Sequence, residues 1–377
     1  MAILFSKPLS ETELLSSHNN NIVEFASNNV LTALSCVADF GTFTFERSPD
    51  PNGLFSFNLK EAAKVLINQN EFVDKLVPDI PNNGYVYQDD TLYKKINVSF
   101  KIIFEGGTTE TVSKSYHFLK KISQPEKYSE NVIDIVNTGL ALLLPFEDNS
   151  NVSYYAPYFE GKPFDIALFS NVERTITVRN KTTTKTITLD LLVGVNRIFL
   201  SQGNKNITLE DELTLRTGIN NLQFEIAPDN YITLLLERIE SDCAEYVRFY
   251  NKQGAYSYYQ FNIFSKESIK TKTIDSIDTN FNDISQTYDN EQITGKSEAV
   301  IKRVMAERTT DRQRKYLESI FSSPKVDIYL NRQFQPTSLD SWRGVKISDG
   351  STVIDENNSP WLDVVLSIGY NNETLTL

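Results

Sequence analysis

The stretch INVSFKIIFEGGTTETVSKSYHF, residues 96–118, decides the fold class of this chain. In its first half apolar residues occupy every second position, namely Ile96, Val98, Phe100 and Ile102. A period of two is typical of a strand with one buried face. Glu105-Gly106-Gly107-Thr108 supplies a turn, and the alternation then returns through Val112, Lys114, Tyr116 and Phe118. The stretch therefore predicts an antiparallel β-hairpin.

Segments of the same kind recur through the middle third of the chain. Ile176 and Val178 alternate with polar residues, and Tyr231 to Ile239 is a further apolar run. Polar turn residues such as Asn180-Lys181-Thr182 separate these runs. Short strands at regular spacing with turns between them favour a β-sandwich.

Helical signals are few and short. Asn58 with Glu61 three positions later has the spacing of a capping box and predicts a helix through about Ile67. Thr310 with Gln313 gives the same signal for a second helix. We therefore predict a mainly β chain of multi-domain, β-sandwich-like organisation, with a few short helices and a C-terminal strand-helix-strand (α+β) part.

The length of 377 residues is too great for one ordinary core and suits two or three domains. Clusters of turn-forming and polar residues suggest where the boundaries lie. We expect an N-terminal β-rich domain over 1–148, a central β-sandwich over 149–270, a polar linker over 271–297 and a C-terminal α+β domain over 298–377.

Composition limits the classes of partner. The chain has a net charge of −12 and a pI near 4.9. Binding to nucleic acid is driven by counterions released around Lys and Arg, so we expect no direct contact with nucleic acid. Cys36 and Cys243 are too few for a disulfide framework or a zinc site, and both are interpreted as small, half-buried thiols.

Apolar stretches are short. Ala2 to Phe5 is too brief for the apolar region of a signal peptide, and Leu140 to Phe146 is far below the roughly 20 residues that span a bilayer. We therefore expect no membrane partner, and synthesis and folding in a cytoplasm.

Motifs for catalysis are absent from the sequence. His18 lies in an Asn-rich stretch and His117 lies on the return strand of the hairpin, and neither has a recognisable partner motif. No phosphate-binding loop, dinucleotide fingerprint, metalloprotease motif or nucleophile elbow occurs. We expect no catalytic residue, cofactor or metal, and no enzyme. A glycosidase needs only two positioned carboxylates, so a glycan-cleaving enzyme stays open as an alternative.

One segment has part of the spacing of a calcium loop. Asp278, Asn280, Asn282 and Asp289 occupy positions 1, 3, 5 and 12 of an EF-hand-like pattern, in which oxygen atoms bind the ion. Asp283 stands where that pattern needs glycine, and Asp289 is shorter than the usual glutamate. We interpret the segment as a solvated acidic loop, with a calcium site as the alternative.

A basic cluster contrasts with the acidic whole and consists of Lys302, Arg303, Arg308, Arg312, Arg314 and Lys315. The simpler interpretation is the solvent face of a strand and a helix. The functional interpretation is an electrostatic contact with an acidic neighbouring subunit.

Tyrosines gather on a second predicted hairpin, which turns at Asn251-Lys252-Gln253-Gly254. Alternation places Val247 and Phe249 on the core face. The opposite face then carries Tyr246, Tyr250, Tyr256 and Tyr258. Tyr is favoured at interfaces, so this face serves either subunit contact or sheet-on-sheet packing.

The same hairpin resembles a pattern, Y-x-R-W-x-N-x-x-G-x-x-x-Y-W, of structural proteins from phages and prophages of Bacteroidetes. Here the residues run Tyr246-Val247-Arg248-Phe249-Tyr250-Asn251 to Gly254-Ala255-Tyr256-Ser257-Tyr258-Tyr259. Phe249 and Tyr259 stand where tryptophan is common in that family.

Two further stretches resemble the same family. Near the N-terminus these are Ser17-His18-Asn19 to Phe25, Pro49-Asp50-Pro51-Asn52-Gly53 and Phe57 to Leu66. Near the C-terminus they are Leu317, Ser323-Pro324-Lys325-Val326 and Trp342-Arg343-Gly344-Val345. The resemblance implies a virion protein of the crAss-like phage type, in the tail, tail hub or neck rings, with no catalytic residues.

The expected partners are therefore other copies of the chain, in a ring or another homo-oligomer, and neighbouring virion proteins. The expected location is the tail or neck of the virion. A carbohydrate-binding β-sandwich module, which also exposes aromatic residues, is the main alternative.

Overall fold

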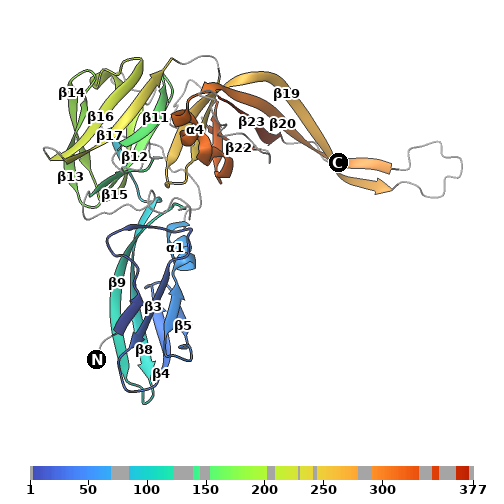
Figure 1. Ribbon diagram of the computed structural model, residues 1–377. Helices are drawn as coiled ribbons and strands as arrows, with labels where there is room; N and C mark the ends of the chain where they lie inside the picture. The colour runs from blue at the N-terminus through green and yellow to red at the C-terminus, as the bar shows by residue number, and fades with distance from the viewer. Residues whose placement is uncertain are drawn as a thin grey trace, which may run out of the picture.

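The computed structural model describes residues 3–68, 85–122, 139–144, 153–201, 209–227, 230–240, 244–278, 291–330, 342–347 and 362–372. Strands account for most of these residues and are arranged in several sheets and a barrel. The prediction of a mainly β fold with sandwich-like parts is confirmed. Figure 1 shows a sandwich at the N-terminal end, a second sandwich above it, and a barrel with a long projecting hairpin.

The N-terminal sandwich has sheets of strand order β1-β3-β6 and β2-β9-β8-β4-β5. Its elements are β1 (Ile3–Lys7), β2 (Leu14–Ser16), β3 (Ile22–Ser27), β4 (Ala33–Asp39), β5 (Thr44–Arg47), β6 (Phe55–Asn58), α1 (Lys60–Ile67), β8 (Tyr93–Phe104) and β9 (Thr109–Leu119). The predicted hairpin is confirmed as β8 and β9, which pair from Tyr93–Leu119 to Ile103–Thr109. The rings of Phe25 and Phe100, with centroids 4.9 Å apart, join the two sheets in the core.

The predicted helix in this part is confirmed as α1, although its start differs slightly. The N-cap is Leu59, without a side-chain cap, and the Oδ1 atom of Asn58 accepts from the Lys60 N–H at 3.1 Å. Glu61 pairs with Lys64, 3.3 Å away, on the surface of the helix. Asn58, the expected N-cap, thus lies one residue before the observed N-cap and supports the helix start from there.

The central sandwich has sheets of strand order β10-β12-β15-β7 and β11-β17-β16-β13-β14. Its elements are β7 (Val86–Asp89), β10 (Leu140–Leu142), β11 (Ser153–Phe159), β12 (Phe164–Ser170), β13 (Arg174–Asn180), β14 (Lys185–Leu191), β15 (Gly194–Ser201), α3 (Leu209–Glu212), β16 (Gly218–Ala227) and β17 (Asn230–Ile239). All residues of β12 and β15 are buried. Strand β7 precedes the N-terminal hairpin β8–β9 in sequence but pairs with β15, so the chain enters the central sheet before completing the N-terminal sandwich.

The C-terminal part is a closed barrel of order β18-β19-β20-β23-β22-β21. Its elements are β18 (Glu245–Tyr250), β19 (Tyr256–Asp278), β20 (Glu291–Thr309), α4 (Asp311–Leu317), the 3-10 helix η3 (Glu318–Ser322), β21 (Val326–Tyr329), β22 (Trp342–Ile347) and β23 (Leu362–Asn372). The capping box of α4 is confirmed, because the Gln313 N–H donates to the Thr310 side chain and the Thr310 N–H donates to the Gln313 side chain.

Two expectations about domain limits differ from the strand pairing. Residues 245–270, assigned to the central sandwich, instead pair with C-terminal strands through β18–β21 and β19–β20. The tyrosine hairpin closes the barrel because β18 pairs with β21 and β19 pairs with β20. The central sandwich and the barrel also share one continuous hydrophobic core, whereas the N-terminal sandwich has its own. The boundary expected at residue 148 lies outside the described residues.

The expected polar linker over 271–297 is wrong for its described residues. Residues 271–278 end β19 and residues 291–297 begin β20, and the two segments pair from Lys272–Ser297 to Asp278–Glu291. The polar composition agrees with exposure, because among the described residues no second layer covers this ribbon and most of its described side chains meet water. Polarity there marks exposure and not the absence of a strand.

Candidate functional site

A two-stranded arm made by the outer halves of β19 and β20 extends away from the barrel (Figure 1). Strand β23 supports β20 up to the pair Glu298–Asn372. Beyond that pair the described arm consists of β19 and β20 alone. Among the described residues, β19 pairs with β18 only as far as Phe261, so its outer edge is open along most of its length.

Isoleucines on this arm are exposed to solvent. Their exposed fractions are 64% for Ile269, 61% for Ile274, 52% for Ile277 and 43% for Ile293. Isolated two-stranded ribbons are marginally stable in water, and open strand edges are templates for pairing. Within the part of the chain that the structure describes, the arm therefore presents apolar side chains and open strand edges that no other element covers.

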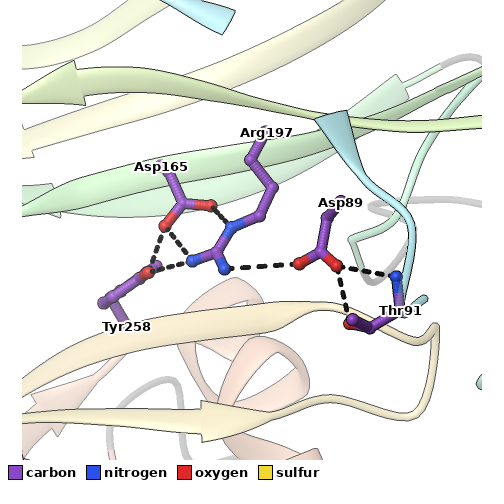
Figure 2. Close-up of polar contacts among 5 residues, drawn as sticks. All are labelled: Asp89, Thr91, Asp165, Arg197 and Tyr258. Atoms are coloured by element: carbon purple, nitrogen blue, oxygen red, sulfur yellow. Dashed lines mark hydrogen bonds and ion pairs between the residues drawn. The ribbon is translucent and has the colours of Figure 1, made fainter. Parts of the chain in front are cut away.

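A buried ion-pair network lies between the central sandwich, including its strand β7, and the barrel. The guanidinium group of Arg197 on β15 donates to both oxygens of Asp165 on β12, at 2.7 and 2.9 Å. Its Nη1 atom lies 3.6 Å from Asp89 Oδ2 on β7. Figure 2 shows Arg197 between the two carboxylates, with the Tyr258 hydroxyl of β19 donating to Asp165 and Thr91 donating to Asp89. All four charged or phenolic side chains are buried.

A second buried arginine continues the network into the barrel. Arg248 on β18 donates to Asp327 on β21 at 2.8 Å. The guanidinium carbon of Arg197 lies 5.1 Å from the centroid of the Tyr256 ring, and that of Arg248 lies 4.9 Å from the same centroid. The Trp342 ring lies 4.5 Å from Arg248. A cation over an aromatic face is stabilised by the ring quadrupole, so the aromatic side chains link the two ion pairs.

Lys120 balances the charge of this network. It is buried and is attracted by Asp89, although burial lowers its pKa to about 8. The buried cations of this network are then Lys120, Arg197 and Arg248, and its buried anions are Asp89, Asp165 and Asp327. Buried charges are tolerated when they are paired and hydrogen-bonded, which this arrangement provides. The network thus fixes the relative position of elements that are distant in sequence.

The turn of the tyrosine hairpin packs on the same junction. Asn251 accepts from the Gln253 and Ala255 N–H groups, and its Nδ2 atom donates to the Leu143 carbonyl at 3.0 Å. Gly254 has a φ of +93°, and a Cβ atom there would lie 3.0 Å from the Lys120 carbonyl oxygen. Only glycine fits this close approach without strain.

The fixed positions of the Y-x-R-x-x-N-x-x-G pattern therefore lie in this junction. Tyr246 donates to the Pro163 carbonyl at 2.8 Å, and Arg248, Asn251 and Gly254 make the contacts described above. Tyr258, the next fixed position, donates to Asp165. These residues hold the hairpin against the rest of the chain.

A cavity of about 270 Å³ opens beside this junction, between the N-terminal sandwich and the barrel. Ile122, Tyr250 and Pro324 give it apolar walls, and Lys121 and Lys252 contribute cationic side chains. Lys121 is buried, and desolvation lowers its pKa to about 8. Lys252 pairs with Glu318 at 2.7 Å. The cavity combines apolar walls with lysine side chains, each of which has a carboxylate partner nearby.

The predicted outward face of tyrosines is wrong as an exposed surface. Tyr246, Tyr250, Tyr256 and Tyr258 are all buried, and burial raises their pKa where a shift is resolved, at Tyr246, Tyr250 and Tyr258. Of the two interpretations, packing between layers is correct, because the central sheet and the network cover this face. These tyrosines therefore do not support subunit contact.

The histidines and cysteines lie in separate places. His117 accepts or donates through Nδ1 to the Tyr93 hydroxyl at 2.7 Å, and His18 lies at the rim of the cavity with Nδ1 3.0 Å from the Ser17 hydroxyl. Burial lowers the pKa of both. Cys36, expected as a half-buried thiol, is fully buried, and burial raises its pKa to about 12. Cys243 lies outside the described residues.

The calcium-loop candidate falls mainly on undescribed residues. Asp278 ends β19, whereas Asn280, Asn282, Asp283 and Asp289 lie outside the described residues. In the part of the chain that the structure describes, no group of three or more His, Cys, Asp or Glu side chains is placed to hold a metal ion.

The basic cluster is divided between surface and interior. Lys302 pairs with Glu245 at 2.8 Å, and Lys315 pairs with Asp311 at 3.1 Å. Arg314 is buried and donates to the Thr309 carbonyl at 2.8 Å, so for this residue a solvent face is the wrong interpretation. It lies inside because α4 packs its Arg314, Tyr316 and Leu317 side against the body.

None of the helices among the described residues is long and apolar enough to cross a membrane.

Two residues of the ion-pair network could have been noticed in the sequence. Asp165 and Arg197 are the charged residues of two strands that are mostly apolar. Their pairing follows from the antiparallel register of β12 and β15, in which Ala167 lies opposite Arg197.

No protein-family model matches the chain, and no curated protein matches it. Among solved structures, the fibronectin(III)-like modules of Clostridium thermocellum CbhA match at a TM-score of 0.20 and 6% identity, covering 63% of this chain and 95% of that one. A Ca2+-stabilised adhesin with which an Antarctic bacterium binds ice matches at a TM-score of 0.19 and 10% identity, covering 97% of this chain and 72% of that one. At these TM-scores neither match carries an argument about function.

Proposed function

We propose that the chain is a non-catalytic structural subunit of a bacteriophage virion, in the tail, tail hub or neck rings. It is made in the host cytoplasm and assembles with other copies of itself and with neighbouring virion proteins. The projecting arm is the observation that carries the proposal, because a ribbon with exposed isoleucines has surface to bury on a partner.

The energetic argument rests on apolar burial. Full burial of an isoleucine side chain stabilises by about 1.5–3 kcal/mol. Four exposed isoleucines on one narrow ribbon, together with an open strand edge, form a surface suited to strand addition by a neighbour or to insertion against one. The rest of the molecule supplies a fixed base, since the ion-pair network anchors β19 by Tyr258.

The sequence resemblance is the reason for proposing a phage particle as the assembly. The hairpin resembles a pattern of structural proteins from Bacteroidetes phages, and its residues Arg248, Asn251, Gly254 and Tyr258 lie in the buried junction of this chain. A junction of this kind gives the subunit a fixed shape, as a geometrical component of a particle requires.

Replacing the outer arm tests the assembly. Lys272 and Ser297 are directly paired, so residues 273–296 can be exchanged for a two-residue Asn-Gly turn. We expect this variant to keep the circular dichroism and melting temperature of the barrel but to remain monomeric in mass photometry at concentrations where the native chain assembles. Equal assembly of the two proteins would refute the arm as the assembly element.

The virion location needs a separate measurement. We expect antibodies against the N-terminal sandwich to label the tail or neck of purified phage particles in electron microscopy, and mass spectrometry to find the chain in those particles. Its absence from particles of a phage that encodes it would refute the virion part of the proposal.

Carbohydrate binding is the second candidate function, favoured by a hollow of about 550 Å³ on the outer face of β13, β16 and β17. Thr177, Glu225 and Tyr231 lie in one row of paired residues, and Arg179 pairs with Glu225 at 3.1 Å. The guanidinium group of Arg179 and the carboxylate of Glu225 can hydrogen-bond to sugar hydroxyls, and the exposed ring of Tyr231 can stack on a sugar ring. Glycan-array binding that Tyr231→Ala abolishes and Ile219→Ala leaves intact would support this function.

A further inference from the structure

The hollow on the outer face of β13, β16 and β17 has a volume of about 550 Å³ and a polar lining. Side chains alternate along a strand, so Val178 and Phe224 enter the core while the residues on either side of them face outward. The polar side chains that line the hollow are Thr177, Arg179, Lys181, Gln223, Glu225 and Tyr231. Convergent polar groups and a volume within roughly 300–1,000 Å³ are typical of ligand sites.

Gln223 lines the hollow with an amide that lacks a hydrogen-bond partner. It lies opposite Arg179 on β13 and Thr233 on β17, and it is 8% exposed. Its side-chain amide makes no hydrogen bond within the described part of the chain. Buried amides are almost always hydrogen-bonded in native proteins, because an unmade bond is costly. An amide both donates and accepts, as a sugar hydroxyl does, so a hydroxylated ligand in the hollow can satisfy it.

Lys181 places a positive charge at one end of the hollow. It follows β13, and its backbone N–H still donates to the Asn221 carbonyl at 2.8 Å. Among the described residues its side chain has neither a carboxylate nor a hydrogen-bond partner. Arg179, two residues earlier, is by contrast held by Glu225, with Nε 3.1 Å from Oε1. The ammonium group of Lys181 can therefore pair with a carboxylate of a ligand.

Tyr231 forms the other end of the hollow. Its ring is 43% exposed, and it lies in the row of paired residues that also contains Thr177 and Glu225. Lys181 comes four residues after Thr177, which corresponds to roughly 13 Å at the rise of a strand. A ligand that touches both ends is therefore longer than a single sugar ring. The apolar face and polar tip of a tyrosine suit the mixed apolar and polar surface of such a ring.

We propose that the hollow binds a short acidic oligosaccharide, with one sugar ring stacked on Tyr231 and the carboxylate of another sugar paired with Lys181. Between these ends, Gln223 and the pair of Arg179 and Glu225 hydrogen-bond to hydroxyl groups. This inference rests on the second candidate function, carbohydrate binding, and specifies the class of sugar. It involves no residue of the arm, so it is independent of how the chain assembles.

Paired oligosaccharides test the class of ligand on the full-length chain. One set contains uronic or sialic acid residues, and the matching set has each carboxyl group reduced to a primary alcohol. We expect the protein to bind members of the acidic set. Their reduced counterparts are expected to bind about three- to fivefold more weakly in bio-layer interferometry, which is the contribution of an exposed ion pair.

Three variants assign the contacts. Lys181→Met is expected to bind both forms equally, at the affinity of the reduced form. Lys185→Met removes an exposed lysine of β14 outside the hollow, and as the matched control it is expected to keep the native preference. Gln223→Met is expected to weaken binding of both forms while leaving the melting temperature of the free chain unchanged or higher, because its amide has no partner there.

The outcomes separate this inference from the function on which it rests. Equal binding of acidic and reduced oligosaccharides by the native chain, lost in Tyr231→Ala, refutes the acidic class and leaves carbohydrate binding in place. Binding to no member of either set refutes both.

Charge probes and the variants provide the remaining refutations. Polyphosphate, ATP or poly-glutamate binding as tightly as the acidic oligosaccharides would show that the hollow responds to charge alone. An equal effect of Lys181→Met and Lys185→Met would remove Lys181 from the contact. A lower melting temperature of Gln223→Met would show that the amide supports the sheet and would overturn its role toward a ligand.

Discussion

Arg197→Met is the substitution that most directly tests the buried junction. It removes the two hydrogen bonds to Asp165, at 2.7 and 2.9 Å, and the ion pair with Asp89 at 3.6 Å. Methionine keeps the apolar stem of the side chain but leaves two buried carboxylates without this cation. Breaking a buried pair in this way typically costs about 3–5 kcal/mol, because an uncompensated charge stays behind. We expect the upper half of that range.

Arg179→Met is the matched control. Arg179 also pairs with a carboxylate on a neighbouring strand, Glu225 at 3.1 Å, but the side chains are 42% and 22% exposed, compared with 2% and 3% for Arg197 and Asp165. Solvent screening reduces the value of an exposed pair to about 0–1 kcal/mol. The two variants therefore share their chemistry and differ in burial.

Urea unfolding followed by circular dichroism measures the difference. We expect the transition of the central sandwich and barrel to move to clearly lower urea in Arg197→Met and to stay in place in Arg179→Met. Adding Asp165→Leu to Arg197→Met is expected to recover part of the loss, since one unpaired carboxylate is then gone. Equal small shifts in both single variants would show that the network does not hold these elements together.

Three further predictions concern the same molecule. Gly254→Ala is expected to lower the melting temperature more than Gly53→Ala, because both have positive φ but only the first places its Cβ 3.0 Å from a backbone oxygen; equal losses would leave backbone strain as the whole cause. Burial lowers the pKa of Lys121 to about 8, so the folded state releases this proton at lower pH than the unfolded state, and stability should rise between about pH 8 and 10. Lys121→Met should lack this component, which is on the order of 3 kcal/mol, and parallel pH profiles of the two proteins would contradict the assignment. In a Cys243→Ser background, iodoacetamide at pH 8 should label Cys36 only after unfolding, since burial raises its pKa to about 12, and rapid labelling of the native protein would contradict its burial.

Local signals in the sequence predicted local structure well. The alternation over 96–118 gives β8 and β9, and the Thr310–Gln313 pair gives the capping box of α4. Each depends on residues that are neighbours in sequence, so the physical cause is contained in the segment itself. The mainly β class follows from the sum of such segments.

The exposed face of tyrosines and the polar linker were wrong for one shared reason. Alternation tells which residues share a face of a strand but not what covers that face. The central sheet covers Tyr246 and Tyr258, whereas nothing among the described residues covers most of the segment 271–278. A strand covered on both faces and a strand covered on neither both depart from simple alternation, and only tertiary packing distinguishes them.

The cavity and the ion-pair network beside it were not predicted from the sequence. The cavity combines Ile122 from the N-terminal sandwich with Tyr250 and Pro324 from the barrel, which are far apart in sequence. Arg197 and Asp165 were visible as charges within apolar strands, but their partner Asp89 comes from a strand that leaves its own sandwich to join another sheet. Such meetings depend on topology.

Strand β19 is one continuous strand from the barrel to the end of the arm, and this continuity has a mechanical consequence. A pull on the arm along its axis is transmitted into the barrel lengthwise, where β19 pairs with β18 and β20. Hydrogen bonds of antiparallel strands run perpendicular to the strands, so a lengthwise pull shears many of them at once and does not open them one after another. Tension between neighbouring copies would thus be resisted by the whole width of the barrel wall.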